Sequence, residues 1–271
     1  MLILSGTLVT ILSNFALRSE ILHCQVGKMK SVQQEERYEC MSLFFIYNRV
    51  FKTKRGLICY MQKQNKIAVI GGAGKAGRYV VEKALEAGYQ VRVLTRNPKQ
   101  FKAFYKHVEI IKGDVRDVEV IRTLFNGCHT VISTLGKPKK ESFIFSSATN
   151  NILTVMNELH ILRYIVVSGG SVDVPGDKKS FLNKMGARMF RILFPNMMKD
   201  KYKELNLLLE SNLDWTFVRL PFVVEGVATG SIKESLRDIP GLKIYNSDIA
   251  DFLIKQIASP LYIRKCPFIA N

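Results

Sequence analysis

A glycine-rich turn between a strand pattern and a helical pattern constrains this chain more than any other feature. The apolar run Ile67–Ile70 stops at four closely spaced glycines, after which apolar residues recur at helical spacing. The turn consists of Gly71, Gly72, Ala73, Gly74, Lys75, Ala76 and Gly77. Strand, glycine turn and helix in this order form a phosphate-binding corner, because the backbone must turn sharply and approach a pyrophosphate closely. The N–H groups that begin the helix then face the phosphate charge.

The glycines fit two versions of this motif. Gly72, Gly74 and Gly77 satisfy the G-x-G-x-x-G of ordinary dehydrogenases, whereas Gly71, Gly74 and Gly77 satisfy the G-x-x-G-x-x-G of extended and atypical short-chain dehydrogenases. A glycine turn without a ligand is the plain alternative, which the flanking strand and helix patterns disfavour.

The end of the second strand pattern, Gln90–Arg96, indicates which dinucleotide binds. NAD-binding versions carry an acidic residue here that holds the ribose 2′-hydroxyl. This chain has Thr95 and Arg96 instead. A hydroxyl and a guanidinium suit a 2′-phosphate, so the sequence favours NADP(H) over NAD(H). A solvated surface arginine is the alternative.

Composition narrows the class of protein. A hydrophobic content of 47% and a charged content of 23% are ordinary for a globular domain, but the net charge is +17. The basic residues are dispersed and accompany no nucleic-acid-binding signature, so nucleic acid is disfavoured as a partner. Five scattered cysteines have no metal-ligand spacing, so we expect no metal site and free thiols in the cytoplasm.

Residues 1–60 differ in pattern from the rest. An apolar stretch over 1–17 lacks preceding positive charge and is short for a membrane span, so both a signal peptide and an anchor are disfavoured. Met61 stands a few polar residues before the first strand. We therefore expect residues 1–60 to be a poorly ordered or mis-called extension, and 61–271 to be the dinucleotide-binding domain.

From residue 66 onward, strand and helix patterns alternate, which predicts an α/β fold with a doubly wound parallel sheet of Rossmann type and a small substrate-side region near the C-terminus. The predicted strands are 66–70, 90–95, 108–112, 129–133, 163–168 and 215–219, with short extra strands at 231–234, 242–245 and 266–269. The predicted helices are 76–87, 98–104, 117–125, 142–160, 199–212 and 247–258.

Ligands in such sheets bind where the strands end. After the third strand, Asp114 can accept a hydrogen bond from an adenine with Val115 beside the ring, or else Asp114 or Asp117 caps the next helix. After the fourth, small polar residues and Gly136 allow the backbone to run close to ribose and nicotinamide, or else the segment is a simple loop. The fifth ends at Ser168, which either polarises a substrate carbonyl or is a turn residue.

With these strand ends, the chain from Lys66 onward resembles the atypical short-chain dehydrogenase/reductase family, in its NAD(P)H-binding, NmrA-like group with biliverdin reductase B/flavin reductase. The matching segments are 71–77, 95–96, 113–115, 200–204, 211–221, 229–230 and 247–252. The resemblance implies that the glycine turn binds pyrophosphate and Arg96 binds the 2′-phosphate. It also implies an adenine and nicotinamide environment formed by Asp114, Val115, Thr134, Leu135, Gly136, Pro221 and Phe222.

One departure from the related enzymes matters. Ordinary short-chain dehydrogenases carry Tyr-x-x-x-Lys, in which the tyrosine donates a proton. If Lys201 takes the lysine place, the tyrosine place holds Met197. Hydride transfer to a flavin-like acceptor needs less from the protein, since the cofactor supplies the chemistry. Ser168 and Lys201 are the catalytic candidates.

The segment 178–198 alternates bulky apolar side chains with lysines and arginines. It is interpreted either as a lid over the substrate pocket or as an amphipathic surface helix that meets a membrane or partner, and the lid is favoured.

The first functional hypothesis is an NADPH-dependent reductase of a flavin-like, quinone-like or other conjugated acceptor. The second is a non-catalytic NADP(H) sensor, and a sugar-nucleotide epimerase or dehydratase comes third.

Overall fold

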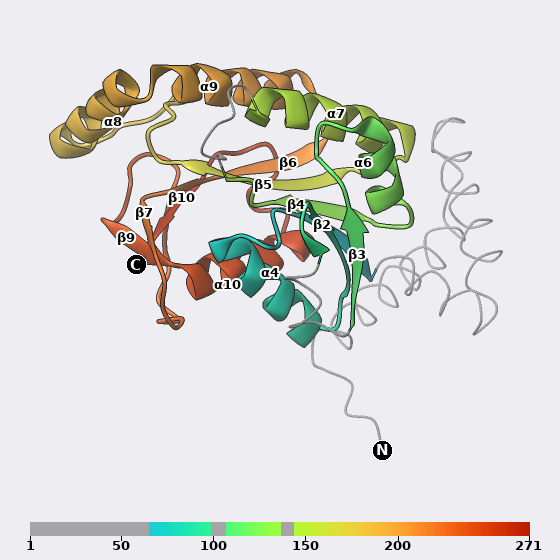
Figure 1. Cartoon of the computed structure of the whole chain (residues 1–271). Coiled ribbons are helices and arrows are strands. Elements are labelled where there is room, and N and C mark those ends of the chain that lie inside the picture. The colour runs from blue at the N-terminus through green and yellow to red at the C-terminus, as the bar shows by residue number, and fades with distance from the viewer. Residues whose placement is uncertain (1–64, 99–106, 137–143) are drawn as a thin grey trace, which may run out of the picture. The chain divides into compact units, whose positions relative to one another are not determined.

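The computed structural model describes residues 65–98, 107–136 and 144–271 (Figure 1). The expectation of an N-terminal extension over 1–60 falls outside the described residues and stays a prediction. So does most of the helix predicted over 98–104.

The described strands form an eight-stranded sheet in the order β3-β2-β1-β4-β5-β6-β10-β8. All neighbours are parallel except β10 and β8, which are antiparallel. Strand β1 pairs with both β2 and β4, so the strand order reverses there and creates the crevice in which such folds bind ligands. The strands are β1 (Lys66–Ile70), β2 (Gln90–Thr95), β3 (Val108–Lys112), β4 (Thr130–Ser133), β5 (Arg163–Gly169), β6 (Asp214–Leu220), β8 (Lys233–Ser235) and β10 (Phe268–Ala270).

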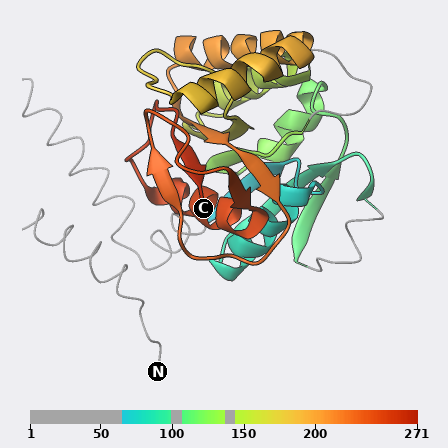
Figure 2. The ribbon, with the colours of Figure 1, turned by 90° about the vertical axis from the view of Figure 1, so that its left-hand side faces the viewer.

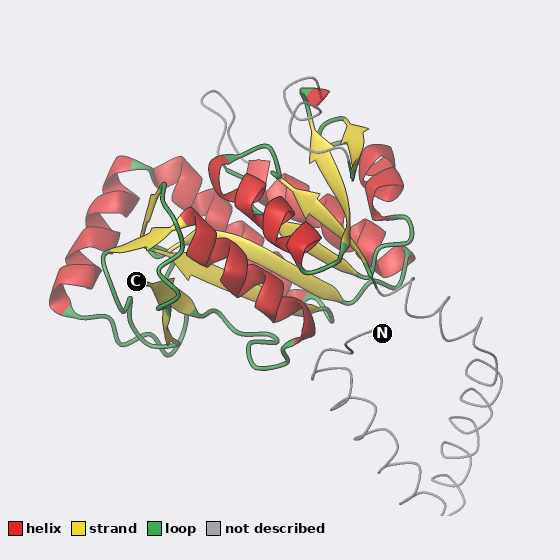
Figure 3. Cartoon of the chain, turned by 90° about the horizontal axis from the view of Figure 1, so that it is seen from below, coloured by secondary structure: helices red, strands yellow, loops and turns green. Residues whose placement is uncertain are grey.

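Helices cover both faces of this sheet. Figure 3 shows α4 (Lys75–Glu86) and α10 (Asn246–Ala258) across one face. In Figure 1, α6 (Val118–Phe125), α7 (Ile144–Glu158) and α9 (Pro195–Glu210) cover the other, with α8 (Phe181–Leu193) beyond them. Two buried apolar clusters, one for each face, fill the space between sheet and helices. The Rossmann-like α/β fold expected from the sequence is confirmed.

A second, two-stranded parallel sheet joins β7 (Phe222–Val224) to β9 (Lys243–Tyr245). Strand β9 was expected, but β7 was not. Its three residues continue the apolar pattern of β6 and are exposed, so the sequence alone could not separate the two strands. Helix α9 also begins four residues earlier than expected, because Pro195 occupies the first turn, where its missing N–H costs nothing.

Carboxylates of α9 tie this helix to α7. Asp200 accepts hydrogen bonds from the backbone N–H groups of Phe145 and Ser146 at 2.9 and 3.1 Å, and so caps the start of α7 from a distant part of the chain. One turn later, Glu204 accepts from Lys201 at 2.8 Å. Burial raises the pKa of Glu204, and the Lys201 ammonium opposes that shift.

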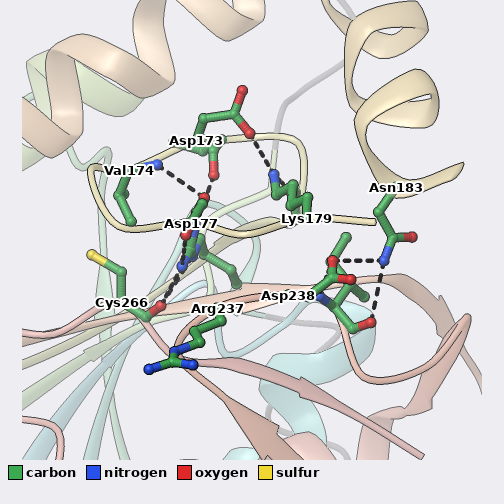
Figure 4. A network of polar contacts seen from close by, with 12 residues as sticks. Asp173, Val174, Asp177, Lys179, Asn183, Arg237, Asp238 and Cys266 are labelled. Atoms are coloured by element: carbon green, nitrogen blue, oxygen red, sulfur yellow. Dashed lines mark hydrogen bonds and ion pairs between the residues drawn. The ribbon is translucent and has the colours of Figure 1, made fainter. Parts of the chain in front are cut away.

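A buried ion pair joins the loop after β5 to the sheet (Figure 4). The guanidinium of Arg219, on β6, donates two hydrogen bonds to Asp177, at 2.6 and 2.9 Å. It also donates to the carbonyl oxygen of Cys266 and stacks 3.5 Å from the ring centroid of Phe268. Because Arg219 is fully buried, its charge depends on these partners.

We therefore predict that Asp177→Ala lowers the free energy of unfolding by about 3–5 kcal/mol, because Arg219 is left buried without its carboxylate. The surface pair Asp251–Lys83 provides a control, and Asp251→Ala should cost less than about 1 kcal/mol. Urea denaturation of both variants measures the difference. Equal losses would show that the buried pair adds nothing beyond a surface pair.

Candidate dinucleotide site

A cavity of ≈ 420 Å³ lies at the carboxyl ends of β1, β2, β3 and β4. It is therefore at the point where the strand order reverses. Its lining comes from five separate segments of the chain, which are Ile70, Gly71, Ala73 and Gly74; Leu94–Asn97; Gly113–Val115; Thr134–Gly136; and Ile144.

The glycine turn forms the floor of the cavity, and the absence of side chains there is a packing requirement. A Cβ on Gly77 would lie 2.1 Å from the backbone oxygen of Gly71. A Cβ on Gly71, whose φ is +79°, would lie 2.7 Å from the backbone oxygen of Thr134. Gly72 instead packs beneath the turn, where a Cβ would lie 2.7 Å from Val93. Within the turn, the glycines that line the cavity are Gly71 and Gly74, in keeping with the G-x-x-G-x-x-G version.

Helix α4 starts at the cavity, and its first turn has the features of an anion-binding site. Its N-cap residue is Gly74, which provides no side-chain hydrogen bond, and no acidic residue occupies the first turn. The backbone N–H of Gly74 itself donates to Gly71 at 2.9 Å and closes the turn. The positive end of the helix dipole therefore faces the space that a pyrophosphate would occupy. Lys75, Ala76 and Gly77 lie within this first turn and do not line the cavity.

The end of β2 supplies polar groups of the expected kind. The hydroxyl of Thr95 accepts a hydrogen bond from the backbone N–H of Asn97 at 3.2 Å, which shapes the turn after the strand. Thr95, Arg96 and Asn97 all line the cavity. A guanidinium and an amide therefore border the cavity at the position where NAD-binding folds place an acid.

The structure shows which of the two acids after β3 caps the next helix, whereas the contact of Asp114 with adenine stays a prediction. Asp117 caps α6, accepting from the backbone N–H groups of Glu119 and Val120. Asp114 lines the cavity and accepts two side-chain hydrogen bonds from Arg116, at 2.8 and 2.9 Å. Those bonds lower the pKa of Asp114 to about 2, with a smaller contribution from the charge of Arg96. Asp114 is thus an ionised acceptor at neutral pH, with buried Val115 beside it.

The end of β4 closes the cavity on its other side. The hydroxyl of Thr134 donates to the carbonyl oxygens of Ile70 and Gly71, each at 3.2 Å. This links the end of β4 to the start of the glycine turn. Leu135 and Gly136 follow along the wall.

The two catalytic candidates do not line this cavity. Ser168 is buried at the end of β5, and its hydroxyl has no hydrogen-bond partner among the described residues. The ammonium of Lys201 lies 3.6 Å from the ring centroid of Phe145 and bonds to Glu204. These contacts give Lys201 a structural task. The catalytic roles of both residues stay predictions.

Pro221 and Phe222 also lie outside the cavity lining, and the Phe222 side chain is 79% exposed. That they close over a nicotinamide ring stays a prediction. Five lining residues were not among the predicted site residues: Ile70, Leu94, Asn97, Gly113 and Ile144. Ile70, Leu94 and Gly113 directly precede predicted residues in the chain. Asn97 follows Arg96 directly and could have been found by extending the strand end by one residue, whereas Ile144 comes from the start of α7 and has no local signal.

Comparisons with known proteins agree with this geometry. A family model described as NAD(P)H-binding matches residues 71–260. A 3 beta-hydroxysteroid dehydrogenase/Delta 5-->4-isomerase of Mycobacterium tuberculosis is 24% identical over an alignment of 183 residues that covers 63% of this chain and 46% of that protein. The chain thus spans about half the length of this relative.

Two solved structures share the fold. ChuY, an anaerobillin reductase from Escherichia coli O157:H7, superposes with a TM-score of 0.63 at 18% identity, over 76% of this chain and 96% of ChuY. A short-chain dehydrogenase/reductase from Veillonella parvula, solved in complex with NADP, gives 0.63 at 17% identity, over 76% and 94%. At these identities the likeness shows the fold alone.

We predict that Gly77→Ala weakens NADPH binding by at least about tenfold and lowers the free energy of unfolding by about 1–3 kcal/mol, because its Cβ would displace the Gly71 carbonyl. Gly186→Ala is the matched control. Gly186 lies in α8 with nothing within 4 Å of its Cβ position, so this change should stabilise the helix slightly and leave binding intact. Titration calorimetry with NADPH measures the affinity of both variants, and urea denaturation measures their free energies of unfolding. Unchanged affinity in Gly77→Ala would separate the glycine turn from the cofactor.

Proposed function

The chain belongs to the NAD(P)H-binding family, and we propose that it is an NADPH-dependent reductase of a flavin-like, quinone-like or other conjugated acceptor. The observation that carries the cofactor choice is the group of Thr95, Arg96 and Asn97 at the edge of the cavity. A guanidinium can hold a 2′-phosphate through paired hydrogen bonds, whereas a ribose hydroxyl calls for an acid.

The geometry of the site supports a binding mode along the sheet edge. The first turn of α4 and the backbone of Gly71 and Gly74 would hold the pyrophosphate. Asp114 would accept a hydrogen bond at the adenine, and Thr134 and Gly136 would border the nicotinamide ribose. When bound, NADPH supplies a hydride, and the residues of this chain position it.

The surroundings of Lys201 favour a conjugated acceptor over an alcohol or a sugar. A dehydrogenase of the ordinary type needs a tyrosine whose pKa a nearby lysine lowers. Here Met197 stands in the tyrosine place, Lys201 is paired with Glu204, and no tyrosine occurs among the described residues that line the cavity. Reduction of a flat conjugated ring asks the protein chiefly to hold two rings in contact.

The edge of the sheet where β6 ends offers apolar surface for such an acceptor. Phe222 and Leu242 are each 79% exposed, and the backbone N–H of Phe222 donates a hydrogen bond to the carbonyl oxygen of Leu242.

We also propose a cytoplasmic location, supported by the two cysteines of the described residues, Cys128 and Cys266, which are both free.

A second candidate is a sensor that binds NADP(H) without turnover and signals to a partner. The pairing of Lys201 with Glu204 favours it, because this ion pair occupies the group that would otherwise assist proton transfer.

Oxidation of NADPH by the purified chain, followed at its absorbance maximum with FMN and with simple quinones, distinguishes the two candidates. Turnover with either acceptor supports the reductase. Tight NADPH binding with no oxidation across the panel would favour the sensor.

We predict that Arg96→Ala weakens NADPH binding by about 10- to 100-fold, since hydrogen bonds to a charged group contribute about 1.5–3 kcal/mol. NADH binding should change little, because NADH has no 2′-phosphate. Arg122→Ala is the control, since Arg122 on α6 pairs with Glu119 of the same helix and with Glu158 of α7, and does not line the cavity. Calorimetry with both cofactors gives the ratio of NADPH affinity to NADH affinity for each variant. An equal loss for NADPH and NADH would refute the 2′-phosphate assignment.

A further inference from the structure

Helix α8 turns its apolar side away from the protein. Ala187 is its one buried residue, and the bulky apolar side chains around it are exposed. Phe181 is 78% exposed, and Leu182 and Ile192 are each 70% exposed. Met185, Met189 and Leu193 are exposed by more than half. The segment favoured as a lid therefore lines no part of the dinucleotide cavity, and its bulky apolar side chains are turned toward the surface.

These side chains form one continuous stripe. Successive residues of a helix are about 100° apart, so positions 181, 182, 185, 189, 192 and 193 fall within an arc of about 120°. Buried Ala187 and half-buried Asn183 and Phe190 lie on the opposite side. At 13 residues the stripe is about 20 Å long. Figure 2 shows α8 at the surface of the molecule, in front of α9.

Basic residues flank the apolar stripe. Residues 178–199 contain six lysines and arginines and no acidic residue. Lys184 and Arg188 are exposed and lie on the helix along one border of the stripe. The surface is therefore apolar along its centre and positively charged along its side, which is the pattern of helices that lie in a membrane interface.

The helix is held firmly in this orientation. Asp238 accepts hydrogen bonds from the Ser180 backbone and the Asn183 side chain, at 2.9 and 2.8 Å (Figure 4). Arg191 forms an ion pair with Asp173, which also binds Lys179 at 2.6 Å. Contacts at both ends thus fix the face that α8 presents, and the exposed stripe is a feature of the folded protein.

We propose that the α8 stripe docks onto the surface of an anionic lipid bilayer. Charge complementarity selects this occupant, because the border cations attract anionic headgroups while the apolar centre enters the acyl boundary. A second copy of this chain would bring two basic borders together. The protruding, convex stripe also suits a deformable bilayer better than a preformed protein groove. Among the described residues, no helix is both long and apolar enough to cross a membrane, so the contact is one of surface association.

The test is flotation of the full chain with vesicles of phosphatidylcholine and phosphatidylserine, and with phosphatidylcholine alone. The triple variant Leu182→Gln/Met189→Gln/Ile192→Gln should bind the anionic vesicles at least about tenfold more weakly, because less apolar area is buried. The matched control is Leu162→Gln/Leu209→Gln/Leu261→Gln, whose leucines are 50–58% exposed elsewhere on the surface. That control should bind as the unchanged chain does.

A second variant tests the charged border. Lys184→Gln/Arg188→Gln should weaken binding to the anionic vesicles by about tenfold and reduce its sensitivity to salt, with little effect on phosphatidylcholine alone. Urea midpoints and NADPH affinity should stay unchanged in every variant, since the altered residues are exposed and lie outside the cavity.

Three outcomes would overturn the proposal. The first is failure of the unchanged chain to float with the anionic vesicles, which would leave an acidic protein as the remaining occupant. The second is equal flotation of the α8 and control variants, which would place membrane contact elsewhere. The third is a dimer in light scattering, without vesicle binding, that the triple α8 variant dissociates, which would identify a second copy as the occupant.

Discussion

Helix α4 approaches β1 so closely that a Cβ on Gly77 would lie 2.1 Å from the Gly71 oxygen. This contact sets where the helix begins, and therefore where its uncapped first turn points. It also places the turn against Thr134, whose hydroxyl bonds to the Gly71 carbonyl from the end of β4. The ends of β1 and β4 are thus locked together at the reversal of strand order. The shape of the cavity, and the positions of the polar residues that line it, depend on that one close approach.

Buried charges organise the region around the ends of β5 and β6 and the start of α7. Asp177 neutralises Arg219, Glu204 neutralises Lys201, and Asp200 caps α7 from a different helix. A charge removed from water needs such partners, so these residues depend on one another across long sequence separations. Of these residues, Lys201 resembles a catalytic group in the sequence, because it can take the lysine place of Tyr-x-x-x-Lys. In the folded chain these residues hold loops and helices in place, and α8 is held in the same way by Asp173 and Asp238.

Much of the cavity lining could be predicted because parallel strands bring their carboxyl ends to one edge. Once the strand ends were located, Gly71, Arg96, Asp114 and Thr134 were expected to gather there, and all four line the cavity. Ile144 could not be predicted, since its place depends on how α7 packs and no local pattern marks it. Similarly, Asp114 and Asp117 both stand shortly before α6 in the sequence, so either could have been its N-cap. Only the path of the chain after β3 showed that Asp117 is the cap.

The sequence by itself determined the alternation of strands and helices, the glycine turn and the basic end of β2, because each depends on residues close together in the chain. The tertiary structure decided which polar side chains are buried and which face of α8 is exposed. Burial depends on contacts between segments far apart, such as Lys201 against Phe145, and periodicity alone reports only that a helix has an apolar side. For α8, the fold turned that side outward because Asp173 and Asp238 hold the polar side and both ends of the helix against the protein.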